Sequence, residues 1–527
     1  MQSPIILQKI SLNKAILMVI GIIIITMGVM IFIHPPSIFP DASHGFQVMR
    51  SMQMGGKFNM LTAPDQDDIS QNSSAFISWW SPGQYLVPYF FQSILKVNTG
   101  QASAITIIIF ELSGLAGLYC FFRKIGFNSL ISAVSLLFIA CQVAFIIPFV
   151  FYNGGEILLF GFVGWFLYGC LAVDKPGIKL LAFVLLSGWL GFICKSSFMW
   201  LYSAGLLCLW LRLSATNTKV NMRRLVINGI WIGIPAILSI VTIYVFYLSK
   251  GATPASAPTG LKLTWQTFSF PLASPLLSGF SVDDLFNGLV FHTTGQVYNP
   301  CFIIAVLLLL AALSLILIAG IIQYVPNNNY RLFLLVFYTV SLLFFCGAYL
   351  RQLNISYEAR HYRIIGLLIV PGTIYLFSTF KPIYQLFFGV ACVGIAISSY
   401  AFFIKGYKFN VNVSARGNTG IAQEYIDQPS LNYLMQLDRQ NSNAIFAFIT
   451  PDIGLEISHN RVITIDPPTL GEQIDYEDFI YDGHAGPLYL LLPANYNNVA
   501  TLLKFFPGYS SFTTTQLGRK YILYAAK

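Results

Sequence analysis

Residues 15–33 read AILMVIGIIIITMGVMIFI, a stretch of 19 residues that contains no charge. A helix of this length is about 28 Å long, close to the roughly 30 Å hydrocarbon core of a bilayer. Lys9 and Lys14 precede the stretch, and no small-residue cleavage site follows it. These flanks favour a retained first membrane span over a cleaved signal peptide.

Ten further apolar blocks follow the first one, and the last of them ends at residue 404. They cover 102–122, 130–150, 157–173, 180–194, 198–211, 225–248, 301–322, 332–350, 364–380 and 383–404. The 527-residue chain is 56% hydrophobic and only 10% charged, with a mean hydropathy of +0.68. An ordinary soluble protein carries about 25% charged residues, so this composition excludes one. We expect a helical polytopic membrane protein with about eleven spans.

The blocks 180–194 and 198–211 are short, and only three residues separate them. One helix over both would be about 48 Å long, too long for the hydrocarbon core. We therefore expect two tightly joined or partly re-entrant segments.

Basic residues gather in the connections after every second block. Residues 1–404 contain 21 Lys or Arg and 10 Asp or Glu, whereas residues 405–527 contain 9 and 11. The basic connections carry Arg123, Lys124, Lys175, Lys179, Arg212, Lys219, Arg223, Arg224, Arg331 and Lys381. Because basic loops stay in the cytoplasm, the pattern places the amino terminus there. The loops 34–101 and 249–300 and the tail then lie outside.

The positions of the cysteines and of the basic residues exclude a disulfide framework, a cysteine-based metal site and a nucleic-acid surface. All eight cysteines lie in or beside apolar blocks, so neither a disulfide framework nor a cysteine-based metal site is expected. A nucleic-acid surface needs clustered Lys and Arg with aromatic residues on a soluble face. The net positive charge instead belongs to loops that flank membrane spans.

Two regions outside the blocks are expected to fold. Residues 85–95 are apolar but too short to cross the bilayer, so an interfacial helix is predicted. The division predicted is a membrane domain over 1–404 and an extracytoplasmic α/β domain over 405–527. In the second domain we expect strands at 443–450, 461–465 and 487–492, a helix at 497–506, and a hairpin formed by 512–516 and 521–524.

The first outer loop carries two acidic groups. Asp41 follows Pro40 directly after the first span, where its carboxylate suits either a helix cap or a general base. His44 lies three residues later. Asp65 and Asp67 form an acidic run with hard oxygen ligands of the kind that Mg²⁺ prefers. A solvated turn is favoured over a metal site there, because no further ligand is suitably spaced.

Ionisable residues within apolar blocks are costly and indicate function by default. Lys195 interrupts a long apolar stretch, where it suits either a lipid phosphate or a side chain reaching to the interface. Glu111 and Glu156 are expected to face the interior of the bundle, as structural partners or as part of a site. Asp283, Asp284 and His292 lie in the segment 249–300 and are expected to be solvated.

A basic cluster precedes the block 364–380. It contains Arg351, Glu358, Arg360, His361, Tyr362 and Arg363. Arginine guanidinium groups bind phosphate in a bidentate manner. The cluster therefore suits either a phosphate or pyrophosphate site or an interfacial belt anchored by tyrosines, and the sequence favours neither.

Four motifs, in this order along the chain, resemble the GT-C superfamily of polytopic glycosyltransferases. They are most similar to the branch with protein O-mannosyltransferases and the lipid A aminoarabinose transferase. The motifs are PDASHGFQ at 40–47, WWSPGQYLVP at 79–88, GWLGFICK at 188–195 and EARHY at 358–362. This chain departs from the family pattern at Ala42, where many members have a second acid, and at His361, where tyrosine is usual.

The resemblance implies transfer of a sugar, with inversion, from a polyprenyl-phosphate donor to a protein, lipid or glycan acceptor outside the cell. Asp41 would deprotonate or orient the acceptor. Lys195 and Arg360, with Arg363 and Arg351, would neutralise the lipid phosphate. Supporting roles would fall to His44, Glu156, Glu358, His361 and Tyr362.

The resemblance further implies that no cofactor is required, and the weak metal candidates Asp65 and Asp67 leave metal dependence open. The expected partners are the lipid-linked donor, the acceptor and membrane lipids, in a bacterial inner or plasma membrane. A lipid or solute transporter or flippase is the alternative, with Glu111, Glu156 and Lys195 along its pathway. A scaffold whose tail binds a partner is a third possibility.

Overall fold

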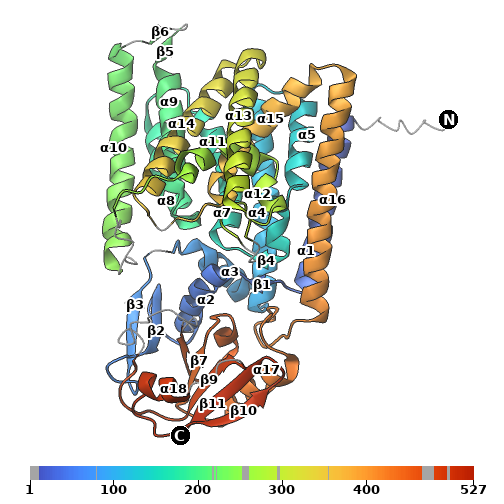
Figure 1. The fold of residues 1–527 in the computed structure, drawn as a ribbon. Helices are drawn as coiled ribbons and strands as arrows, with labels where there is room; N and C mark the ends of the chain where they lie inside the picture. The colour runs from blue at the N-terminus through green and yellow to red at the C-terminus, as the bar shows by residue number, and fades with distance from the viewer. Residues whose placement is uncertain are drawn as a thin grey trace, which may run out of the picture.

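A computed structural model describes residues 11–78, 80–216, 219–220, 222–251, 260–292, 297–353, 355–465, 480–494 and 499–527. Long helices lie side by side in a bundle, and a smaller domain built around a sheet lies at one end of the bundle (Figure 1). The predicted helical membrane protein with a small α/β tail is therefore confirmed. Trp79 of the aromatic motif lies outside the described residues.

Each of the eleven predicted blocks falls on helical structure. The helices are α1 (Leu12–Ile33), α4 (Thr99–Ile125), α5 (Ser129–Ala140) with α6 (Val143–Ile146) and η1 (Ile147–Phe149), α7 (Gly155–Ala172), α8 (Ile178–Cys194), α9 (Phe198–Ser214), α10 (Met222–Phe246), α13 (Pro300–Tyr324), α14 (Asn328–Leu350), α15 (Arg363–Ser378) and α16 (Pro382–Asn412). In the described part, eight helices are long and apolar enough to cross a membrane. The chain bends by 67° between α5 and α6, and α8 and α9 have only 17 residues each. The count of eleven spans therefore stays a prediction.

The expectation of a plain outer loop over 249–300 was wrong for its central part. That part contains α11 (Trp265–Gly279) and the short α12 (Val282–Leu285). α11 packs against α13, α14 and α15, and its Phe270 and Leu277 side chains are fully buried. Pro271 and Pro275 disguised this helix in the sequence, because proline inside a helix removes backbone hydrogen bonds and normally ends it.

The first outer segment folds against the end of the bundle. It contains β1 (Ser37–Ile38), α2 (Pro40–Gln53), β2 (Met60–Pro64), β3 (Asn72–Phe76) and α3 (Gly83–Leu95). β2 and β3 form an antiparallel hairpin, and β1 pairs in parallel with β4 (Phe151–Tyr152). α3 is the helix predicted at 85–95, and Phe90 and Ile94 on it are more than half exposed, as an interfacial helix requires.

The described part of the C-terminal domain contains the elements expected of it, together with one more α-helix and a short 3-10 helix. Its elements are α17 (Gln428–Gln440), β7 (Ile445–Phe448), η4 (Ile453–Glu456), β8 (Arg461–Thr464), β9 (Leu488–Pro493), α18 (Val499–Phe505), β10 (Thr513–Leu517) and β11 (Tyr521–Ala526). The strand order is β10-β11-β9-β7-β8, with β7 parallel to β8 and β9. Phe446 and Phe448 enter one hydrophobic core while Ile445 and Ala447 enter another, because successive strand residues face opposite sides of the sheet.

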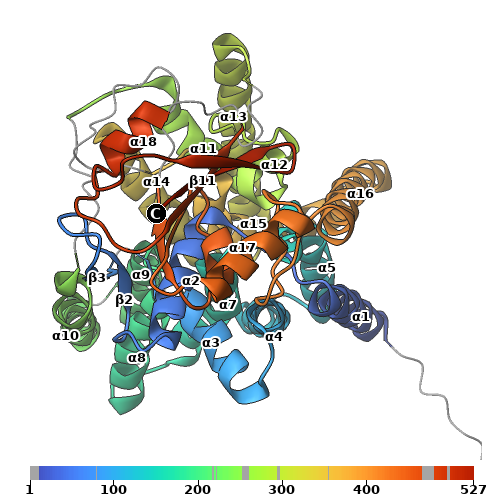
Figure 2. The same cartoon turned by 90° about the horizontal axis from the view of Figure 1, so that it is seen from below.

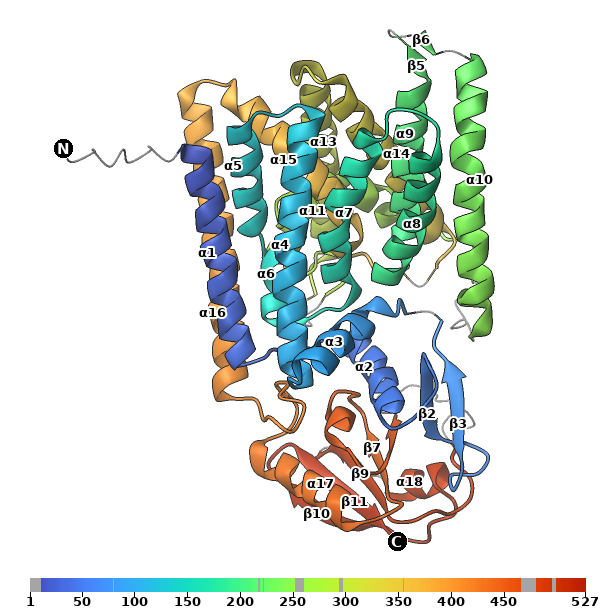
Figure 3. The same ribbon diagram turned by 180° about the vertical axis from the view of Figure 1, so that it is seen from behind.

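The basic connections share one end of the molecule. The links α4–α5, α7–α8, α9–α10, α13–α14 and α15–α16 lie at the end of the bundle away from the C-terminal domain (Figure 3). This is the arrangement that the positive-inside pattern requires. Which end faces the cytoplasm stays a prediction.

The C-terminal domain docks on the first outer segment through α2. Viewed from below, the domain covers α2 and the centre of the bundle, while α1, α10 and α16 stand at the periphery (Figure 2). Arg50 is buried, and its guanidinium donates to the carbonyl oxygens of Ile457, at 2.6 Å, and Asn460, at 2.5 Å. Gln47 donates to the carbonyl oxygen of Pro451 at 2.5 Å. These bonds join the two regions through side chains of one helix face.

Replacing Arg50 is expected to loosen this docking. Arg50→Ala removes two charge-assisted hydrogen bonds and leaves two carbonyl groups unpaired, a loss on the order of 2–4 kcal/mol. Thermal unfolding in detergent should begin at a lower temperature, and limited proteolysis should cut the chain faster between α16 and α17. Lys57→Ala, a change of an exposed cation in the same segment, serves as the control. Equal stability of the two variants would contradict the assigned role of Arg50.

Candidate functional site

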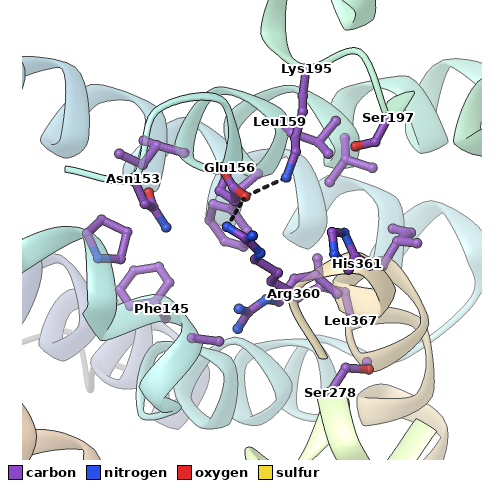
Figure 4. Close-up of a pocket in the computed structure, with 18 of the residues that line it drawn as sticks. Phe145, Asn153, Glu156, Leu159, Lys195, Ser197, Ser278, Arg360, His361 and Leu367 are labelled. Atoms are coloured by element: carbon purple, nitrogen blue, oxygen red, sulfur yellow. Dashed lines mark hydrogen bonds and ion pairs between the residues drawn. The ribbon is translucent and has the colours of Figure 1, made fainter. Parts of the chain in front are cut away.

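Five charged side chains from four segments meet where the bundle faces the C-terminal domain. Lys195 Nζ lies 2.5 Å from Glu156 Oε1, and Arg360 Nη1 lies 3.7 Å from the same oxygen (Figure 4). Arg360 Nη1 also lies 3.8 Å from Asp41 Oδ2, and its Nη2 lies 2.9 Å from Glu358 Oε2. The Arg360 guanidinium is thus shared by three carboxylates.

Strand pairing brings Asp41 and Glu156 together. The Phe39 amide donates to the carbonyl oxygen of Tyr152 at 2.9 Å, which extends the parallel pairing of β1 with β4. α2 begins directly after β1, with Asp41 in its first turn, and α7 begins shortly after β4, with Glu156 in its first turn. Two carboxylates at helix starts are thereby placed side by side, where the helix dipoles stabilise them.

Close packing of two helix ends brings Lys195 to Glu156. A Cβ atom on Gly155 would lie 2.7 Å from the carbonyl oxygen of Cys194, so only glycine permits this approach of α7 to the end of α8. Gly154 has a φ of 67°, a conformation that favours glycine. Lys195 ends α8 in the short link to α9, as the pair of short blocks predicted.

Arg360 lies on η3 (Ala359–Tyr362), which a buried acid holds in place. Asp283 accepts hydrogen bonds from the Ala359 amide at 2.9 Å and from the Leu289 amide at 3.0 Å. Ser278 adds a bond from its hydroxyl to the carbonyl oxygen of Tyr362 at 3.1 Å. The expectation that Asp283 is solvated was therefore wrong: it is 5% exposed, and it positions the backbone next to Arg360.

A pocket of about 870 Å³, partly open to solvent, extends from this cluster into the bundle. Its polar lining consists of Glu111, Gln142, Asn153, Glu156, Lys195, Ser197, Ser278, Arg360, His361 and Arg363. Apolar residues such as Phe145, Leu159 and Leu367 complete the wall (Figure 4). Within the described part of the chain, the buried atoms Arg360 Nε and Asn153 Oδ1 have no hydrogen-bond partner. Such groups are suited to binding a polar ligand.

Asp41 is the most exposed member of the cluster, at 46%. Its partial burial raises the pKa of its carboxyl above the ordinary value, while the nearby positive charge of Arg360 opposes that rise. The negative charges of Glu156 and Glu358 raise the pKa further. A carboxylate with a raised pKa beside an open pocket is suited to accept a proton.

Most of the predicted site residues come together. Glu156, Lys195, Arg360, His361 and Arg363 line the pocket, and Asp41 and Glu358 contact Arg360. His44 lies in α2 one turn after Asp41, and its charge lowers the Asp41 pKa.

Two other predicted residues, Arg351 and Tyr362, neither line the pocket nor pair with Arg360. Arg351 is exposed at the end of α14. Tyr362 is fully buried, with its ring 4.3 Å from that of Phe345. Gln142, Asn153 and Ser278 also line the pocket, and sequence reasoning missed them because uncharged polar residues are common in loops and helices.

The acidic run in the β2–β3 turn bonds within the turn itself. The Asp65 carboxylate accepts from the Asp67 amide at 2.9 Å, and the Asp68 carboxylate accepts from the Ser70 amide at 3.0 Å. These are turn-stabilising bonds typical of aspartate. Among the residues described, no group of three His, Cys, Asp or Glu is placed to hold a metal ion.

Comparisons with known proteins complete the description. No protein-family model matches the chain, and no curated protein sequence matches it. Three solved structures resemble it over nearly all its length: arabinofuranosyltransferase AftD from Mycobacteria, ArnT from Cupriavidus metallidurans in the apo state, and the oligosaccharyltransferase AglB from Archaeoglobus fulgidus with an inhibitory peptide and a dolichol-phosphate.

The likeness in each case is distant. The TM-scores are 0.49 for AftD, 0.46 for ArnT and 0.44 for AglB, at identities of 12%, 12% and 11%. The matches cover 98%, 98% and 97% of this chain, and 40%, 98% and 74% of those chains. This chain thus spans two fifths of the length of AftD. A helical bundle with an α/β domain at one end agrees with the fold class predicted from the sequence. Likenesses at this level assign no substrate and no residue role.

The role of Asp283 is open to a direct test. The carboxylate accepts hydrogen bonds from two backbone N–H groups, whereas the side chain of an asparagine has only one oxygen. Its NH₂ group would face one of the two N–H groups, and the loss of that hydrogen bond costs on the order of 1–3 kcal/mol. Asp283→Asn should therefore increase hydrogen–deuterium exchange in the segment 357–363. The matched change Asp174→Asn, in an exposed ion pair at the other end of the bundle, should not. Unchanged exchange in Asp283→Asn would remove its positioning role.

Proposed function

We propose that the protein is a membrane glycosyltransferase. It moves a sugar, with inversion, from a polyprenyl-phosphate donor to an acceptor at the end of the bundle where the C-terminal domain lies. One observation carries the proposal: the Asp41 carboxylate lies 3.8 Å from Arg360, a cation that lines the same pocket as Lys195. A base next to a pair of cations matches a reaction that removes a proton from one reactant and releases a phosphate from the other.

The donor phosphate fits the cationic side of the pocket. Lys195 and Arg360 both point at Glu156, so a phosphate there would meet two donors that are now ion-paired (Figure 4). Arg363 lines the same pocket and adds a third positive charge. Arginine binds phosphate oxygens in a bidentate manner, and lysine adds a point charge. The surrounding apolar helices suit the isoprenoid chain of such a donor.

The transfer balances with these groups. An acceptor hydroxyl oxygen attacks the anomeric carbon, and its proton passes to the Asp41 carboxylate. The bond from the anomeric carbon to the phosphate oxygen breaks, and the electron pair leaves with the polyprenyl phosphate. Lys195 and Arg360 stabilise the charge that develops on this leaving group, and Asp41 later returns its proton to water. Attack opposite the leaving group inverts the configuration. No cofactor and no metal ion enters this scheme.

Replacing Asp41 tests the proposal. Asp41→Asn keeps the shape of the side chain but removes the base, so transfer should fall on the order of 10²- to 10⁴-fold. The measurement is mass spectrometry of glycans, glycolipids and proteins from cell envelopes with equal amounts of wild type and variant. Purified Asp41→Asn should still bind polyprenyl phosphate, whereas Lys195→Met should bind it roughly tenfold or more weakly. Lys57→Met provides the matched cation control.

Two results would count against the proposal. Unaltered envelope products in Asp41→Asn would remove this residue from the chemistry. Movement of a labelled polyprenyl-phosphate sugar across proteoliposomes, without a covalent product, would support a transporter instead.

The pH dependence gives an independent test. Asp41 must be ionised to accept a proton, so the rate should rise with pH through its pKa, which burial raises. Glu358 is one of the negative charges that raise this pKa. Glu358→Gln should therefore lower the Asp41 pKa and move the acid limb of kcat/KM to lower pH. Asp482→Asn, a change in an exposed loop of the C-terminal domain, should leave the limb in place. An upward shift in Glu358→Gln would contradict the assignment.

A further inference from the structure

A second cavity lies between the first outer segment and the C-terminal domain. It has about 880 Å³ of space, partly open to solvent. From the membrane end it is lined by Phe39, Pro40 and Phe151, and from the C-terminal domain by Glu424, Tyr425 and Asp452. None of the described residues that the C-terminal domain contributes to this cavity is among the predicted site residues.

The second cavity adjoins the charged pocket through an aromatic wall. Phe39 and Phe151 stack with their ring centroids 5.5 Å apart, and both line the second cavity. The guanidinium carbon of Arg360, which lines the first pocket, lies 5.7 Å from the Phe39 ring centroid. Asp41 directly follows Pro40, so the proposed base lies at the boundary of the two cavities.

The chemistry of the second cavity differs from that of the first. Among the described residues that line it there is no Lys, Arg or His, and neither Glu424 nor Asp452 forms an ion pair in the described part of the chain. Ser37 donates to one oxygen of Glu424 at 2.5 Å, and a carboxylate has about four acceptor sites, so acceptor capacity remains.

Asp452 is the buried carboxylate of the second cavity. Asp452 is 6% exposed, and burial raises its pKa to about 6. A buried carboxylate without a cation favours a ligand that donates hydrogen bonds or carries a positive charge, and it repels an anion. Tyr425 and the Phe39–Phe151 pair add flat apolar faces of the kind that pack on the C–H face of a sugar ring.

We propose that this cavity binds the acceptor, and that the acceptor presents a saccharide there. In this proposal, which rests on the proposed function, Glu424 and Asp452 accept hydrogen bonds from saccharide hydroxyl or ammonium groups and discriminate against an anionic saccharide. The bound hydroxyl then reaches Asp41 past the Phe39–Phe151 pair. Donor and acceptor thus occupy cavities of opposite charge on either side of one carboxylate.

Saccharide binding tests this directly and does not depend on transfer. The probes are three trisaccharides that differ in a single substituent, which is a hydroxyl, an ammonium or a carboxylate. Saturation-transfer difference NMR with the full chain in lipid nanodiscs measures their binding. Wild type should bind the hydroxyl and ammonium probes at least fivefold more tightly than the carboxylate probe. Glu424→Gln/Asp452→Asn should lose most of this binding and this preference.

Two further variants make the outcome unambiguous. Asp482→Asn changes an exposed carboxylate of the same domain and should bind all three probes as wild type does. The single variant Glu424→Gln alters an exposed residue, so it should fold normally and show a weaker form of the same loss. Unfolding temperatures of all variants identify any that misfold.

The failure of this inference can be told from failure of the proposed function. Equal binding of the carboxylate probe, or unchanged binding in Glu424→Gln and in a folded double variant, would overturn the acceptor cavity. Asp41→Asn should reduce transfer on the order of 10²- to 10⁴-fold while binding of the trisaccharides persists. If wild type binds the trisaccharides but forms no product with any polyprenyl-phosphate donor, the transferase proposal fails and the saccharide site stands.

Discussion

The position of the Arg360 guanidinium is the constraint on which the arrangement of the site depends. A charge at the edge of a hydrocarbon layer is costly unless it is paired. Arg360 meets this requirement with three carboxylates, from Asp41, Glu156 and Glu358. These come from α2, α7 and the approach to η3, so one side chain fixes the relation between segments far apart in the sequence. Without it, Asp41 would face the like charges of Glu156 and Glu358.

The C-terminal domain also helps to position the charged site, because it contacts α2. α2 carries Asp41 at its first turn and Arg50 near its last, and Arg50 is anchored to the backbone of the domain. The N-terminal end of α2 follows β1, whose pairing with β4 fixes this end at the bundle. α2 therefore connects the helical bundle to the C-terminal domain, and the position of Asp41 depends on both. None of the described residues of this domain lines the charged pocket, yet the domain helps to determine the geometry of that pocket through α2.

The sequence predicted those parts of the fold that depend on composition over a long window. An apolar block such as 15–33 has few alternatives to a membrane helix, so every predicted block fell on helical structure. α11 was not predicted, because its prolines and hydroxyl residues interrupt the apolar pattern of a membrane helix, although neighbouring helices bury it.

Among site residues, Lys195 and Arg360 were recognisable because a charge is rare in such surroundings. The role of Asp283 was not, because its partner is a backbone amide 76 residues away. Arg351 and Arg360 looked equivalent in sequence, yet a helix end separates the exposed one from the pocket. Burial and backbone partners are properties of the assembled fold, and neither is present in local sequence.

Glu156 gives the charged pocket a property that a simple cationic site lacks. It pairs with both Lys195 and Arg360, so in the proposed reaction a donor phosphate must compete with a carboxylate that is already in place. These ion pairs must be broken when the phosphate binds, so their free energy weakens the affinity for the phosphate. In the transition state of the proposed reaction, the charge on the leaving phosphate increases, so the two cations interact with it more strongly than with the ground-state donor. In the same proposal, Glu156 pairs with the cations again after the product lipid leaves, which limits tight binding of the product. A carboxylate among phosphate-binding cations thus favours turnover over affinity.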